Sequence, residues 1–90
     1  MSDQPQDSAI QFPCEFPIKA MGLATAELEL TVVQIVRRHA PDLGEGAVRQ
    51  RPSTNGKYVS ITVTVTARSQ AQLDAIYRDL SACEQVLMAL

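Results

Sequence analysis

Residues 50–67, Q-R-P-S-T-N-G-K-Y-V-S-I-T-V-T-V-T-A, decide the fold. Asn55-Gly56 is typical of a β-hairpin turn, and a strand of strict alternation follows it. The apolar side chains of that strand share one face and the polar ones share the other: Val59, Ile61, Val63 and Val65 against Tyr58, Ser60, Thr62, Thr64 and Thr66. One face needs a core and the other tolerates water, which indicates an antiparallel sheet covered on one side only.

The rest of the chain supplies the partners of this strand. Hydrophobic periodicity predicts, in order, a strand at 14–22, a helix at 25–39, a loop at 42–46, a strand at 47–51, the long strand, a helix after Ser69 and a last strand at 84–90. Pro17 donates no hydrogen bond, so the first strand should not be paired on both sides there. Thr25 can cap the first helix, and Ser69 with Gln72 forms a capping box for the second.

The predicted order β-α-β-β-α-β indicates an α+β class. Each helix has a single apolar stripe to bury, so both must cover the same face of one sheet. Right-handed crossovers then give the ferredoxin-like sandwich with strand order 4-1-3-2. In that layout Cys14 and Cys83 lie at opposite ends of neighbouring strands, on the order of 20 Å apart, which is too far for a disulfide.

Composition restricts the class of protein. The polar residues 1–11 are predicted to be a disordered tail, and residues 12–90 a single domain with eight basic and eight acidic side chains. A nearly neutral domain has no strong field to attract nucleic acid from a distance. Neither a membrane span nor a signal peptide is expected, and two reduced thiols suit a cytoplasmic protein.

The chain has few residues that could support catalysis. One histidine, two separated cysteines and no C-x-x-C predict neither a metal site nor a cofactor, and no catalytic residue is assigned. His39 at the end of the first helix is expected to favour the helix dipole. Acylphosphatases share this fold, but their arginine-bearing loop is replaced here by Met21-Gly22-Leu23-Ala24. We therefore predict that the protein is not an enzyme.

Two groups of residues remain as candidate sites. Arg49, Arg51 and Lys57 flank the hairpin, and are interpreted either as an anion or nucleic-acid contact or as a charged edge that prevents aggregation. RNA recognition would need stacking aromatics on the open sheet face, where only Tyr58 is available.

The second group lies around the end of the first strand. Gly22 could let a small ligand or a partner chain approach the start of the helix, which makes Met21, Gly22, Leu23 and Thr25 the candidate ligand or partner site, unless Gly22 is a simple turn residue. The apolar end V-L-M-A-L predicts either a homodimer through an edge strand, another protein partner, or cover by the segment around Phe12.

Three segments resemble the YbeD-like family of small bacterial proteins: F-P-C-E-F-P-I-K-A-M-G at 12–22, V-V-Q-I-V-R-R-H-A-P at 32–41 and R-P-S-T-N-G-K-Y-V-S-I-T-V at 51–63. The resemblance implies the ferredoxin-like fold and a likeness to ACT-type regulatory domains, in which Gly22 corresponds by topology to a glycine near the ligand loop. Genes of that family often lie beside lipoate-attachment genes, so the resemblance also implies a regulator of lipoate metabolism. It implies no catalytic residues.

The sequence thus leads to three competing hypotheses. The first is a non-enzymatic regulatory module that binds a small metabolite or a protein partner. The second is a weak acyl or phosphate hydrolase that uses Arg51, Lys57 and His39. The third is nucleic-acid or anion binding through the basic hairpin, which would depend steeply on salt.

Overall fold

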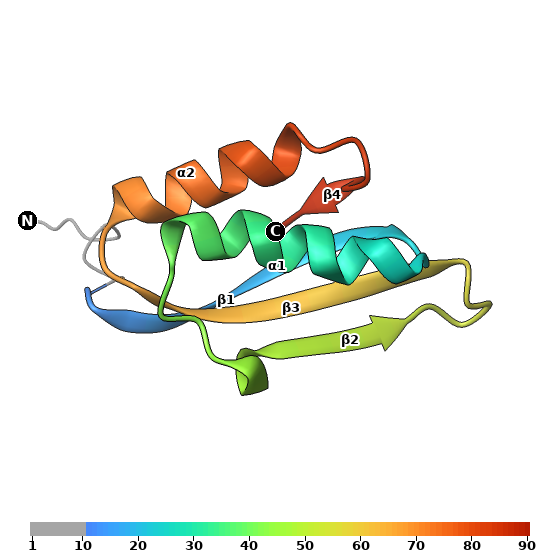
Figure 1. The fold of residues 1–90 in the computed structure, drawn as a ribbon, viewed down its shortest axis with the longest axis horizontal. Helices are drawn as coiled ribbons and strands as arrows, with labels where there is room; N and C mark the ends of the chain where they lie inside the picture. Colours follow the sequence, from blue (N-terminus) through green and yellow to red (C-terminus); the bar gives the residue numbers. More distant parts are fainter. Residues whose placement is uncertain (1–10) are drawn as a thin grey trace, which may run out of the picture.

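The computed structural model describes residues 11–90, in which two helices lie on one side of a four-stranded sheet (Figure 1). The elements are β1 (Cys14–Leu23), α1 (Ala26–His39), a short 3-10 turn η2 (Glu45–Ala47), β2 (Val48–Pro52), β3 (Tyr58–Ala67), α2 (Gln70–Ser81) and β4 (Met88–Ala89). Each strand is antiparallel to its neighbours in the order β2-β3-β1-β4. The predicted ferredoxin-like fold with order 4-1-3-2 is therefore confirmed. The predicted tail, apart from Gln11, lies outside the described residues.

The alternation of β3 builds the core as predicted. Val59, Ile61, Val63 and Val65 are at most 4 % exposed and face the helices, and β1 adds Ile18 and Ala20 to the same face. The helices contribute buried side chains at helical spacing: Leu28, Val32, Ile35 and Val36 from α1, and Leu73, Ile76 and Leu80 from α2. Burial of one such aliphatic side chain contributes about 1.5–3 kcal/mol, so this layer supplies most of the stabilisation.

The two helices begin in different ways. Ser69 caps α2 as predicted, since its Oγ accepts a hydrogen bond of 3.1 Å from the backbone N–H of Gln72. The second bond of the predicted capping box, from the backbone N–H of Ser69 to the side-chain amide of Gln72, is replaced by other bonds. The Oε1 of Gln72 accepts from the N–H of Arg68, and its Nε2 donates to the carbonyl of His39. Thr25 occupies the N-cap position of α1 but makes no side-chain cap, so that prediction is wrong. The start of α1 is held instead by backbone bonds at Ala24 and Thr25.

The predicted last strand over 84–90 is much shorter in the structure. β4 is assigned only at Met88–Ala89, because a turn closed by the N–H of Val86 and the carbonyl of Cys83 directs Val86 into the core. Backbone bonds from Leu87 to Met21, and in both directions between Leu90 and Lys19, extend the pairing beside β1. Cys14 and Cys83 are both free thiols, as expected.

Neither helix in the part of the chain that the structure describes has the length and apolar composition needed to cross a bilayer.

Candidate functional site

The open face of the sheet, opposite the helices, carries polar and apolar side chains in ordered rows. Register places Lys19 of β1, Thr62 of β3 and Arg49 of β2 side by side in one row. Directly opposite residues in a sheet have Cβ atoms about 5 Å apart, so the hydroxyl of Thr62 lies between the cationic side chains of Lys19 and Arg49.

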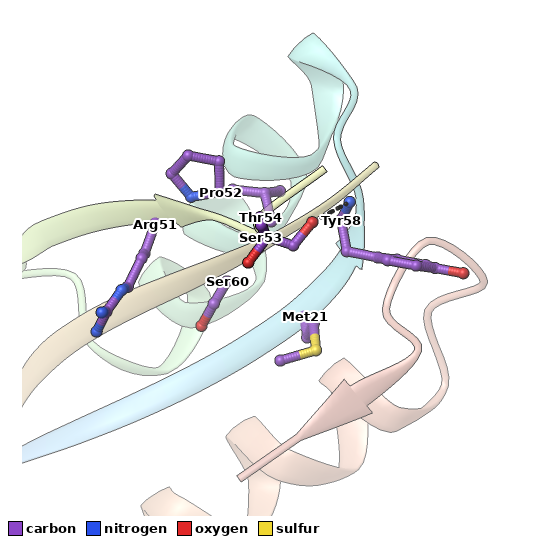
Figure 2. A pocket seen from close by; sticks show the side chains of 8 residues that line it. Met21, Arg51, Pro52, Ser53, Thr54, Tyr58 and Ser60 are labelled. Atoms are coloured by element: carbon purple, nitrogen blue, oxygen red, sulfur yellow. Dashed lines mark hydrogen bonds between the residues drawn. The ribbon is translucent and has the colours of Figure 1, made fainter. Parts of the chain in front are cut away.

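A second row runs parallel to the first. Met88 of β4 pairs with Met21 of β1, which pairs with Ser60 of β3, which in turn pairs with Arg51 of β2. Figure 2 shows Met21, Ser60 and Arg51 on three adjacent strands, lined up across the sheet. The open face is therefore apolar at its β4 side, hydroxyl-bearing on β3 and cationic at its β2 side, with Lys19 of β1 as a further cation near the middle.

Large apolar side chains are exposed at the β4 side of this face. Met21 is 38 % exposed, Met88 51 % and Leu90 66 %, and Leu23 lies beside them opposite Tyr58. These side chains, together with Lys19, Arg49, Arg51, Ser60 and Thr62, form the surface that we call the amphipathic face. Contiguous exposed apolar side chains with a polar rim commonly mark an interaction site.

The amphipathic face is hollowed rather than flat. One hollow of about 380 Å³ lies between Met21, Arg51, Tyr58 and Ser60 (Figure 2). A neighbouring hollow of about 340 Å³ is lined by Lys19, Arg49, Gln50, Arg51, Ser60 and Thr62. Both hollows are open to solvent and share Arg51 and Ser60, so they form one continuous surface.

The predicted basic cluster is only partly assembled. Arg49 and Arg51 lie together, but Lys57 lies in the hairpin with its Nζ 5.5 Å from the centroid of the Tyr58 ring. The cation that joins the two arginines is Lys19, which sequence reasoning left out of the cluster. The alternation of β1 placed Lys19 on the open face, but only the register with β3 brings it into line with Arg49.

The predicted ligand residues divide between two surfaces. Met21 and Leu23 lie on the open face, and Leu23 also lines, together with Thr25, a second hollow of about 310 Å³ that Glu27, Gln85 and Leu87 border. Gly22 is buried between them on the helix side, where a Cβ would lie 2.3 Å from the backbone oxygen of Gln85. The close approach that this glycine permits is made here by the chain's own α2–β4 connection.

His39 lies in the helix layer, away from the cations of the open face. Its Nε2 is 2.7 Å from Oδ2 of Asp79 on α2, and this hydrogen bond is the main cause that lowers the pKa of the Asp79 carboxyl. Arg51 projects from the other side of the sheet, so the structure does not bring His39, Arg51 and Lys57 to one site. Among the described residues, no group of three or more His, Cys, Asp and Glu converges as metal ligands would.

Similar proteins cover the whole of this architecture. A protein from Janthinobacterium sp. (strain Marseille), described as "UPF0250 protein", is 46 % identical over 86 residues, which are 96 % of this chain and 94 % of that one. A "UPF0250 protein" from Chromobacterium violaceum is 47 % identical over 90 residues and covers both chains completely. The solution structure of HP0495 from H. pylori shares the fold, with a TM-score of 0.69 at 18 % identity over 100 % of this chain and 98 % of that one. Residues 7–90 match the family "Protein of unknown function (DUF493)". The chain therefore belongs to the DUF493 family of bacterial UPF0250 proteins, the YbeD-like family that its sequence resembles.

Proposed function

We propose that the protein is a non-enzymatic regulatory module of the bacterial cytoplasm, which acts by binding a small metabolite or a protein partner. The observation that carries this proposal is the amphipathic face, where Met21, Met88 and Leu90 lie exposed beside Lys19, Arg49 and Arg51. A ligand or partner that covered the exposed methionine and leucine side chains would remove apolar surface from water, which favours binding.

The metabolite version favours an anion with an apolar tail. Its anionic group would lie against Arg49 and Arg51, and its tail would lie on Met21 and Met88. Lipoate, to which the family resemblance points, has this chemistry, with a carboxylate at the end of an aliphatic chain. Leu23 and Thr25 would serve the same ligand from the end of β1.

A thermal-shift assay tests the metabolite version with lipoate, octanoate and the amino acids. A ligand at ten times its Kd stabilises the folded state by about 1.4 kcal/mol, which raises the Tm of a domain of this size by roughly 6–11 °C. The shift should disappear in Met21→Ser and persist in Leu30→Ser, since Leu30 is equally apolar but lies exposed on α1, away from the sheet. If no compound produces a shift, the metabolite version is wrong.

The partner version makes a different prediction. Tagged protein should retain a specific protein from bacterial lysate, and the double variant Met21→Ser/Met88→Ser should lose it. Recovery of the same background from the wild type, this variant and a tag-only control would refute the partner version.

Anion or nucleic-acid binding is the second candidate function, because three cations border one hollow. Three phosphate contacts predict that log K falls against log salt with a slope of about −2 for a single strand. Affinity for a labelled single-stranded oligonucleotide should then fall in Arg49→Gln/Arg51→Gln. Affinity that is independent of salt, or unchanged in this variant, would exclude it.

A further inference from the structure

We infer that the amphipathic face is the docking surface for an acidic amphipathic helix of a partner protein. This inference rests on the proposed binding function and names the chemistry of its partner. Three features of the open face carry it: the order of its side chains, its dimensions and its charge.

The order of the side chains matches one flank of a helix. Both rows begin with an exposed apolar residue at the β4 side, Met88 or Leu90, and end with a hydroxyl on β3 and an arginine on β2. Between them, β1 contributes Met21 to one row and Lys19 to the other. An occupant must therefore present apolar side chains along one line and carboxylates along a parallel line. An α-helix does this with a leucine stripe at i, i+3 or i+4 and i+7, and with glutamates on the adjacent flank.

The dimensions of the face also suit a helix. From β4 to β2 there are three interstrand steps of about 4.8 Å, or about 14 Å in all, and a helix with its side chains is about 10–12 Å across. Along β1, the rows from Lys19 to Leu23 span about 13 Å, which corresponds to roughly two and a half helical turns. The predicted occupant is thus a helical segment of about ten residues.

The charge of the face selects an acidic partner over a second copy of this chain. Among the side chains that the structure describes, none forms an ion pair with Lys19, Arg49 or Arg51, and the three cations border one hollow. A twofold axis across the strands would place these cations against their own copies. An axis along the strands would place them against Met88 and Leu90, which is also unfavourable.

The openness of the hollows argues for a helix rather than a free metabolite. Small-molecule sites usually enclose most of the ligand surface, whereas both hollows here are open and continuous. A helix of ten residues covers less than a standard protein interface, so we expect a transient complex with a micromolar Kd.

Fluorescence anisotropy with synthetic peptides tests this inference on the full chain. The probe is a labelled helical peptide of about 14 residues with a leucine stripe flanked by glutamates. One control replaces every glutamate by glutamine, and the other keeps the composition but scrambles the stripe. The probe should bind at least about tenfold more tightly than either control, because both lines of contact contribute.

Two protein variants with the same change in charge provide the matched control. Arg49→Gln/Arg51→Gln should weaken probe binding about tenfold, since each exposed ion pair contributes a few-fold. Arg37→Gln/Arg78→Gln, on the helix side, should leave binding unchanged, and melting curves will show that both variants are folded.

Every other outcome overturns the inference and distinguishes it from the proposed function. Equal binding of the probe and the scrambled peptide would show that charge alone, and not the leucine stripe, determines binding. Tighter binding of an oligonucleotide would favour the nucleic-acid function, and a dimer in sedimentation that dissociates in Met21→Ser/Met88→Ser would assign the face to a second copy. A thermal shift with octanoate but no peptide binding would refute the docking of a partner helix and support the metabolite version of the proposed function. If neither the peptide nor octanoate binds, both the helix-docking inference and the metabolite version are refuted.

Discussion

Replacement of Gly22 by alanine should destabilise the protein far more than a single added methyl group normally does. The new Cβ would lie 2.3 Å from the backbone oxygen of Gln85 and 3.1–3.2 Å from the methyl groups of Leu28. Since non-bonded heavy atoms settle at about 3.5 Å, the carbonyl of Gln85 must retreat by about 1 Å. That movement would stretch the hydrogen bond of 2.8 Å from Leu87 to Met21, which holds the α2–β4 connection against β1.

The cost follows from these contacts. Overpacking contributes about 1–3 kcal/mol, and the loss of one backbone hydrogen bond about 1 kcal/mol. Alanine reduces the entropy of the unfolded chain, which offsets about 0.4–1 kcal/mol. A net loss of about 2 kcal/mol should lower the Tm by roughly 8–16 °C.

Thermal unfolding followed by circular dichroism measures this loss, and amide exchange at Leu87 and Leu90 shows whether β4 detaches. The matched control is Gly44→Ala, where nothing lies within 4 Å of the added Cβ and φ is −89°. This control should be neutral or stabilise the protein by up to about 1 kcal/mol. A Gly22→Ala variant within about 2 °C of the wild type, with normal protection of Leu87, would refute the packing argument.

Three further predictions concern the helices and the hairpin. The hydrogen bond with His39 is the main cause that lowers the pKa of Asp79 in the folded protein. The resulting stabilisation is present at pH values above the ordinary aspartate pKa, and it is lost as the pH falls through the lowered pKa of the folded state. Urea titrations at about pH 5 and about pH 3 should therefore show a larger loss for the wild type than for Asp79→Asn, and equal losses would contradict this. Ser69→Ala should cost about 1 kcal/mol in denaturant unfolding, whereas Thr25→Ala, which removes no cap bond, should cost less than about 0.5 kcal/mol; the reverse order would show that the caps are misassigned. Gly56→Ala should cost about 1–2 kcal/mol because φ is +75° there, and an unchanged Tm would mean that the turn adapts.

Local patterns were sufficient to predict most of the fold. The alternation of residues 58–67 and the apolar stripes of both helices depend only on spacing along the chain, and each strand and helix formed close to its predicted bounds. The last strand was the exception. An apolar run such as V-L-M-A-L has no period of its own, so the turn that carries Val86 into the core could not be read from it.

The candidate site could be predicted only in part, because it depends on pairing between distant segments. Arg49 and Arg51 are neighbours on one strand and were found, whereas Lys19 reaches them only through the β1–β3 register. The bond between His39 and Asp79 joins residues 40 positions apart, and it forms because α1 and α2 pack together. No spacing rule within one helix indicates such a contact.

The place of β1 in the middle of the sheet has a consequence for the nascent chain. Cys14 pairs with Ala67 and Leu23 with Tyr58, so the whole of β1 is synthesised before either of these partner residues. At about 5–20 residues per second, the roughly 50 residues that separate Cys14 from Ala67 take several seconds to synthesise. The two strands of the β2–β3 hairpin are neighbours in the sequence, so they can pair as soon as both have emerged. During translation, one of the two central strands of the finished sheet therefore stays without a neighbour until that hairpin arrives.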